Sequence, residues 1–164
     1  MAVAAVFVSR PTVLTPDQQA LYRRWMDGLA GLDFAQLTIP RRSYATPPWE
    51  QLRRTVNGAD GALILGFRQL LVERGSYRPG TSEQQSAAGS YASAWNQVEA
   101  GLATMAGLPV LVVPEGAATE GVFARDVWRG GVYGTRMDVW TAGDGDRDPS
   151  LRAWATAVGR HAGA

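Results

Sequence analysis

The segment 90–103 contains one acidic residue, Glu99, in a setting that could give a carboxylate unusual chemistry. Helical spacing places Trp95, Glu99 and Leu102 along one stripe, with Val98 beside it. A carboxylate flanked by tryptophan and apolar side chains is poorly solvated, so we expect Glu99 to hold its proton tightly or to have a specific partner. Periodicity leaves one alternative open, in which Glu99 turns to solvent or pairs with an arginine.

Four further candidate residues directly follow two predicted buried strands. Ser9 and Arg10 follow the first strand, and Phe67 and Arg68 follow the third. In an open α/β sheet, ligands bind outside the carboxyl ends of the strands, where the strand order reverses. We therefore expect these four residues to contact a ligand. The two arginines could grip a phosphate through a bidentate fork, or lie solvated on the surface.

A helix predicted over 93–106 begins at the same edge of the sheet. Its free N–H groups would favour an anion near Ser93. Trp95 could pack against a sugar or a base, or else lie in the core. Asn96 or Gln97 could hold sugar hydroxyl groups. We take Ser93, Trp95 and Asn96 as further candidates for substrate binding.

These residues need a scaffold, and the chain alternates predicted strands with predicted helices. The strands are continuous apolar runs, which indicates a parallel sheet covered on both faces. We predict an α/β fold, a flavodoxin-like three-layer sandwich with a five-stranded parallel sheet in the order 2-1-3-4-5, formed by one domain over residues 1–164. The predicted strands cover 3–8, 33–39, 61–66, 110–113 and 132–140, and the predicted helices cover 16–31, 49–56, 93–106 and 150–160.

The stretch 68–91 is long and polar, and we predict a loop there. Compact domains rarely contain a loop of this length unless it has a function. A lid over the site is one such function.

Composition excludes several kinds of chemistry. The 164 residues include no cysteine and one histidine, and all 16 basic residues are arginine. Thiolate metal sites, cysteine nucleophiles and lysine Schiff bases are therefore impossible, and a histidine-based triad is improbable. The sequence also lacks the GxGxxG and Walker patterns, which argues against a dinucleotide-dependent redox enzyme. We expect no metal and no cofactor.

The charge balance and the hydropathy pattern limit the partners. A formal net charge of +1 argues against a nucleic-acid partner. No apolar run approaches the ~18 residues of a membrane span, and no targeting segment is evident. We expect a cytoplasmic protein with no membrane partner.

Two segments carry a resemblance to a known superfamily. The segment 93–103, followed by 107–113, resembles the active-site helix and next strand of nucleoside 2-deoxyribosyltransferase-like proteins. The Ser93-x-Trp95-x-x-x-Glu99 spacing also resembles the catalytic helix of TIR domains, some of which cleave NAD. The resemblance covers residues 3 to 127, and it rests on the order and spacing of several segments.

The resemblance implies that Glu99 is the reactive carboxylate of an enzyme that breaks or exchanges an N-glycosidic bond. The implied substrate is a nucleoside, a nucleotide or NAD. The segment 66–69 departs from the family, because transferases usually carry an acidic residue there to handle the base. The arginine in that segment suggests a phosphorylated substrate, or a hydrolase in place of a transferase.

Two alternatives remain. One is a non-catalytic TIR-like module that binds nucleotides or signalling partners. The other is a lysine-decarboxylase-like phosphoribohydrolase, whose P-G-G-x-G-T-x-x-E pattern the segment 89–95 does not satisfy.

The six tryptophans bear on assembly. Trp128, Trp140 and Trp154 lie where the strand signal is weak, so an aromatic interface would be a natural use for them. The resembled transferases are oligomers. We therefore predict a homo-oligomer.

Overall fold

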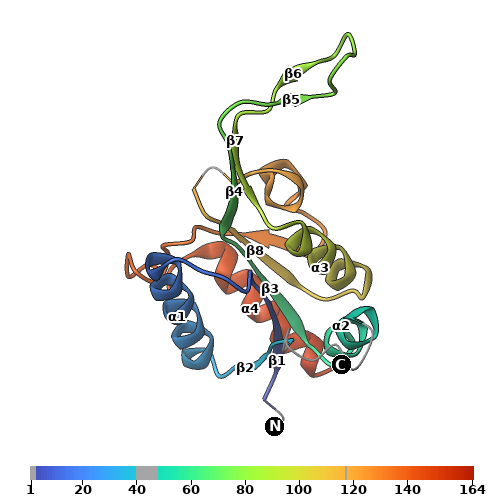
Figure 1. The fold of residues 1–164 in the computed structure, drawn as a ribbon. Helices are drawn as coiled ribbons and strands as arrows, with labels where there is room; N and C mark the ends of the chain where they lie inside the picture. Colours follow the sequence, from blue (N-terminus) through green and yellow to red (C-terminus); the bar gives the residue numbers. More distant parts are fainter. Residues whose placement is uncertain (1–2, 40–47, 117) are drawn as a thin grey trace.

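Five parallel strands form the central sheet of the protein (Figure 1). The fold is described from a computed structural model that covers residues 3–39, 48–116 and 118–164. The strand order is β2-β1-β3-β8-β9, and every neighbouring pair is parallel, which confirms the predicted order 2-1-3-4-5. The strands are β1 (Ala5–Ser9), β2 (Ala35–Leu37), β3 (Gly61–Gly66), β8 (Val110–Pro114) and β9 (Val132–Gly134).

Helices cover both faces of the sheet. Helices α1 (Pro16–Gly31) and α4 (Pro149–Ala162) pack on one face, and α2 (Pro48–Asn57) and α3 (Ala94–Met105) pack on the other. Successive side chains of a strand point to opposite faces. In β1 this alternation sends Val6 and Val8 into the α1/α4 core, and Phe7 into the α2/α3 core.

Capping residues stand at the helix ends. Thr15 caps α1 through a capping box with Gln18. Ser93 caps α3, and its hydroxyl accepts a hydrogen bond from the backbone N–H of Trp95. Gly107 follows α3 with φ +76°, a conformation that glycine adopts without strain. Local sequence therefore sets where these helices begin and end.

The last strand is shorter than predicted. β9 ends at Gly134, and the prediction of a strand to Trp140 was wrong. Beyond Gly134 the backbone bonds locally, with the Ala142 N–H donating to the Asp138 carbonyl at 2.8 Å. Apolar residues of this stretch, such as Val139, still point into the α1/α4 core. The alternation of apolar and polar residues here resembles that of a strand, although the stretch is a series of turns.

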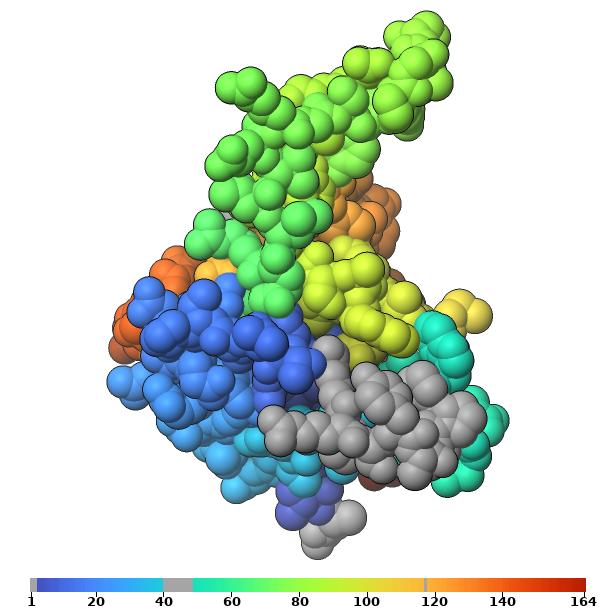
Figure 2. All heavy atoms as spheres, in the orientation of Figure 1, coloured from blue at the N-terminus to red at the C-terminus, as the bar shows by residue number. Residues whose placement is uncertain are grey.

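The stretch 68–91 forms a ribbon, so the prediction of a loop was wrong. Strand β4 (Arg68–Val72) pairs antiparallel with β7 (Gly89–Ala92), and β5 (Ser76–Tyr77) pairs with β6 (Gln85–Ser86). The ribbon projects away from the sheet and helices (Figures 1 and 2). Both faces of β4 meet solvent, so its pattern lacks the continuous apolar run of a buried strand.

The C-terminal tryptophans pack within the chain. Trp154 is fully buried and donates to the Pro109 carbonyl at 3.1 Å. Trp140 makes an edge contact with Trp25, with ring centroids 6.1 Å apart. Trp128 is half-buried against the α2/α3 core. The three tryptophans from which we predicted an intermolecular interface therefore pack within the chain. The homo-oligomer itself stays a prediction.

Within the described ranges, every helix is too short or too polar to span a bilayer.

Candidate active site

Glu99 lies on the buried face of α3. This face is formed by Asn96, Glu99, Ala100 and Ala103, at the i, i+3, i+4, i+7 spacing of a helix packed on a sheet. Ala100 and Ala103 are small, which lets α3 approach β3 closely. The carboxylate is only 4% exposed. Trp95, Val98 and Leu102 are on the exposed side of the helix, so the inward stripe is offset from the predicted one.

Ser9 joins the end of β1 to this carboxylate. It lies two residues after Phe7, so strand alternation directs its side chain toward α3. The Ser9 hydroxyl donates a hydrogen bond to Glu99 Oε2. Ser9 is 1% exposed, so this bond is shielded from bulk water. A charge-assisted hydrogen bond is stronger in such an interior than in water. The carboxylate of Glu99 thus has the specific partner that its surroundings predicted.

Asn96 completes a buried chain of polar side chains. Its Nδ2 donates to the Ser9 Oγ at 2.8 Å, one turn of helix before Glu99. Asn96 is 0% exposed, a burial that does not fit the direct sugar contact that we expected of it. Its Oδ1 is buried and has no hydrogen-bond partner among the residues that the structure describes.

Phe67 is on the other face of the sheet from Glu99. It continues the alternation of Leu63 and Leu65, and all three pack in the α1/α4 core. Phe67 is 0% exposed, so its position is that of a core residue. The expectation that it contacts substrate overlooked this alternation.

The two candidate arginines are held near the carboxyl ends of β1 and β3. The Arg10 guanidinium lies over the Tyr22 ring, 4.5 Å from its centroid, and donates to the Pro11 carbonyl at 2.9 Å. Arg68 is more exposed, and its Nε is 3.7 Å from Glu115 Oε2. Arg68 is therefore the more available of the two for an anionic ligand.

Glu115 directly follows β8 and places a further carboxylate at this edge. Its Oε2 accepts hydrogen bonds from Gln18 Nε2 at 2.8 Å and from the Arg68 backbone N–H at 2.7 Å. These bonds connect α1, the start of β4 and the end of β8. We read Glu115 as an anchor for the base of the ribbon.

Trp95 is 41% exposed and lies against another surface tryptophan. Its ring centroid is 5.2 Å from that of Trp49, which begins α2, and Trp49 is 56% exposed. Trp95 is therefore not a core residue, and an exposed indole remains available to stack on a base or a sugar.

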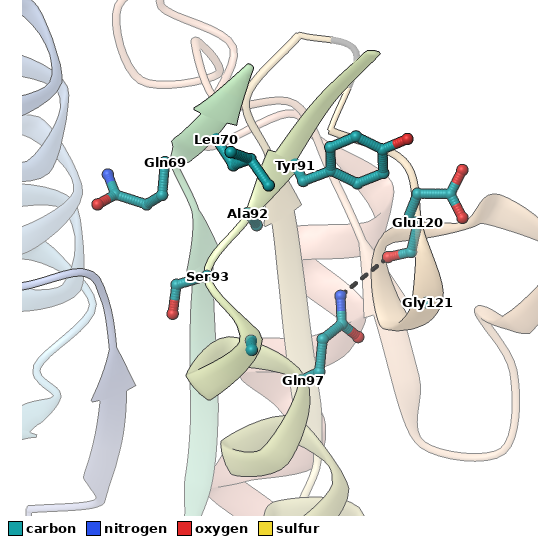
Figure 3. Close-up of a pocket in the computed structure, with 9 residues that line it drawn as sticks. Gln69, Leu70, Tyr91, Ala92, Ser93, Gln97, Glu120 and Gly121 are labelled. Carbon is teal, nitrogen blue, oxygen red and sulfur yellow. Dashed lines mark hydrogen bonds between the residues drawn. The ribbon is translucent and has the colours of Figure 1, made fainter. Parts of the chain in front are cut away.

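A cavity of about 500 Å³ lies where the ribbon meets the start of α3 (Figure 3). Gln97 lines it, but both ends of that side chain are occupied: Nε2 donates to the Glu120 carbonyl at 3.0 Å, and Oε1 accepts from the Val122 N–H at 2.8 Å. Gln97 thus fixes the 120–122 loop to α3. The lining residues are Gln69, Leu70, Tyr91, Ala92, Ser93, Ala94, Gln97, Glu120 and Gly121.

A second cavity, of about 560 Å³, lies at the carboxyl ends of β8 and β9. Its polar groups mostly bind one another. Thr135 donates to Asp148 at 2.8 Å, and Arg136 contacts Asp138 at 3.1 Å. In the part of the chain that the structure describes, no group of three or more His, Asp or Glu side chains could hold a metal ion.

Comparison with known proteins identifies the fold of the chain. No family model matches the chain, and no curated protein matches it. Among solved structures, a 2-deoxyribosyltransferase from Bacillus psychrosaccharolyticus matches with a TM-score of 0.50 and 11% identity, over 86% of this chain and 90% of that one. The protein has the fold of this 2-deoxyribosyltransferase. This confirms the fold that the sequence resemblance implied.

Two other solved structures are similar at slightly lower scores. A CMP N-glycosidase, BcmB, from Clostridium botulinum has a TM-score of 0.49 and 10% identity, over 80% of this chain and 87% of that one. A conserved protein from Enterococcus faecalis has a TM-score of 0.48 and 13% identity, over 97% of this chain and 99% of that one.

Proposed function

We propose that the protein breaks or exchanges the N-glycosidic bond of a nucleoside, a nucleotide or NAD, with Glu99 as the nucleophile or the stabiliser of the oxocarbenium ion. The observation that carries the proposal is the buried Glu99 carboxylate, held by Ser9 at the carboxyl edge of the sheet. Ligands of open α/β sheets bind at this edge, beside the point where the strand order reverses.

The position of Glu99 suits the chemistry of glycosidic cleavage. As the bond between C1′ and the base nitrogen breaks, its electron pair leaves with the base and positive charge develops on the sugar. A carboxylate oxygen of Glu99 can stabilise that charge or bond to C1′ as a glycosyl ester. Water, or a second base, then attacks C1′ and releases the carboxylate. With water, the hydroxyl stays on the sugar and one proton goes to solvent or to the base.

The hydrogen bond from Ser9 supports this role. It engages Oε2 and fixes the orientation of the carboxylate plane. Preorganised groups reduce the reorganisation needed as charge develops. The low exposure of Glu99 also places the reacting charge where electrostatic interactions are less screened than in water.

The neighbouring residues favour a substrate with an anionic group or a base that leaves readily. Ser93 is at the N-terminus of α3, and Arg68 is partly exposed close to the end of β3. Both could contact a phosphate. The segment 66–69 supplies no acid to protonate a leaving base. NAD meets both conditions, because nicotinamide is released without prior protonation.

The direct test is to incubate the protein with a panel of ribonucleosides, 2-deoxyribonucleosides, their monophosphates and NAD. Released bases are then separated by chromatography, with and without a second free base as acceptor. Release of a base supports the proposal. If the base is released only when the acceptor is present, the enzyme is a transferase. Calorimetric binding of a nucleotide without base release would favour the non-catalytic TIR-like module.

Glu99→Gln tests the residue itself. The substitution preserves volume and helix propensity, so the fold should survive. Turnover should fall at least ~100-fold, mainly in kcat, because the lost charge stabilises the transition state more than the ground state. The matched control is Glu50→Gln, since Glu50 forms a surface ion pair with Arg54 on α2. Near-normal turnover in the Glu99 variant would overturn the assignment.

A further inference from the structure

We propose that Asn96 is a positioning residue, which acts through Ser9 to direct a hydroxyl proton onto the Glu99 carboxylate. The inference rests on the proposed function of Glu99 and adds a residue to that site. It also changes the role of Asn96, from a contact with substrate to a contact with the catalytic machinery.

The protons along the buried chain set the direction of its hydrogen bonds. A serine hydroxyl has one proton to donate and lone pairs to accept with. Asn96 Nδ2 donates to the Ser9 Oγ at 2.8 Å, so the lone pair on that side is occupied. The single Ser9 proton is then available to Glu99 Oε2, to which it donates. Asn96 thereby sets the direction of the Ser9 hydroxyl.

An asparagine at position 96 lowers the stability of the fold. It shares the buried face of α3 with Ala100 and Ala103, where an apolar side chain would pack without loss. Within the described ranges its buried Oδ1 has no hydrogen-bond partner, which costs stability. A buried polar group left unsatisfied calls for an explanation such as a catalytic role. The hydrogen bond from Nδ2 to Ser9 supplies that explanation.

The Asn96 side-chain amide has its N–H end, and not its oxygen, directed toward Ser9. If Asn96 were turned over, its carbonyl oxygen would face the Ser9 hydroxyl and accept the proton. Ser9 would then point away from Glu99, and the ionised carboxylate would lose the hydrogen bond from Ser9. The observed polarity, with the N–H toward Ser9, is the one that supports a charged Glu99. This is the protonation state that a nucleophile requires.

A double-mutant cycle tests whether Asn96 acts through Ser9. Asn96→Ala should lower kcat about 3- to 10-fold, the effect of one hydrogen bond, and should leave KM within about twofold. In the Ser9→Ala background the same substitution should have almost no further effect, because the intermediary is gone. Equal effects in both backgrounds, or a rise in KM alone, would overturn the proposal.

A spectroscopic arm requires no substrate. The side-chain carboxyl ¹³C resonance of Glu99 is assigned by its loss in Glu99→Gln. Asn96→Ala should shift this resonance in the wild-type background and not in the Ser9→Ala background. Asn57→Ala, which removes an exposed asparagine at the end of α2, is the matched control and should not shift it. An unshifted resonance in Asn96→Ala would contradict the proposal.

The two arms separate the failure of this proposal from the failure of the proposed function. If no compound in the panel releases a base but the resonance shifts as described, the Asn96–Ser9–Glu99 arrangement stands and the enzyme activity fails. If base is released but the cycle is additive, the activity stands and the role of Asn96 fails. If Asn96→Ala does not fold, Asn96→Ser replaces it in both arms. A serine side chain keeps a polar group at position 96 but is too short to reach Ser9.

Discussion

Three polar side chains share a water-excluded volume at the carboxyl end of β1. Ser9, Asn96 and Glu99 are 1%, 0% and 4% exposed. Each of the hydrogen bonds between them joins α3 to β1. Burial of polar groups costs free energy unless they are paired, so these contacts constrain how α3 sits on the sheet as well as the chemistry of Glu99.

Close packing at the end of β3 gives a prediction at the residue scale. A Cβ added to Gly66 would lie 2.5 Å from the Phe123 ring, whereas one added to Gly101 on α3 would meet nothing within 4 Å. Gly66→Ala should therefore destabilise the protein by about 1–3 kcal/mol through overpacking. Gly101→Ala, the control, should stabilise it by about 0.5–1 kcal/mol, because alanine favours a helix.

Urea unfolding followed by circular dichroism measures both changes. Equal stability of the two variants would show that Phe123 does not pack over Gly66 as described.

Among the elements, the ribbon of β4 to β7 depends least on the core. β5 and β6 pair with each other, and Tyr77 on β5 contacts Tyr91 on β7, with hydroxyl oxygens 3.1 Å apart. Tyr91 in turn donates to the Ala87 carbonyl at 2.8 Å. A two-stranded ribbon is marginal by itself, so these side-chain contacts matter to its order.

The tyrosine pair gives a prediction at the element scale. The hydrogen bond to Tyr91 raises the pKa of Tyr77 from 10.0 to about 12. Tyr91→Phe should return this pKa toward 10.0, since the partner hydroxyl is lost. The shift also sets a sign for stability: the contribution of Tyr77 is complete below pH 10 and is lost as the pH rises to about 12.

Ultraviolet titration of tyrosinate measures the change, with Tyr77→Phe in each background isolating the signal of Tyr77. A Tyr77 that still ionises near pH 12 without the Tyr91 hydroxyl would contradict the contact.

For the whole molecule, the ribbon is the surface through which the predicted homo-oligomer could form. Leu70 and Leu71 are 56% and 66% exposed on β4. We propose a second copy of the chain as their partner. The ribbon tip carries Glu73 and Glu83 together with Arg74 and Arg78, so its charges are balanced and two copies meet no like-charge barrier about a twofold axis.

Light scattering at micromolar concentration should therefore give the mass of a dimer or a larger assembly. Leu71→Asp should shift the mass toward that of one chain, because burial of a carboxylate at an apolar contact is costly. Val3→Asp is the control, since Val3 is 61% exposed and precedes β1, at the opposite edge of the sheet from the ribbon. A monomeric wild-type protein would refute the prediction, and equal masses for both variants would exclude the ribbon as the contact.

Local signals in the sequence determined the elements and their order. The apolar runs at 61–66 and 110–113 became interior parallel strands, and Thr15 and Gly107 mark helix ends. Capping depends on neighbours within about one turn of helix, and a buried strand is recognised from its own apolar run. The position of Glu99 on a helix at the carboxyl edge of the sheet followed from the same information.

Tertiary structure decided which side chains meet. Ser9 faces α3 and Phe67 faces away from it because strand alternation and helix packing assign each to its face of the sheet. Asn96 and Glu99 became the inward side of α3 because Ala100 and Ala103 let that side approach β3. The ribbon at 68–92 formed through pairing between strands distant in sequence. Such contacts form between segments that are distant in sequence, and the periodicity of one segment does not specify its partner.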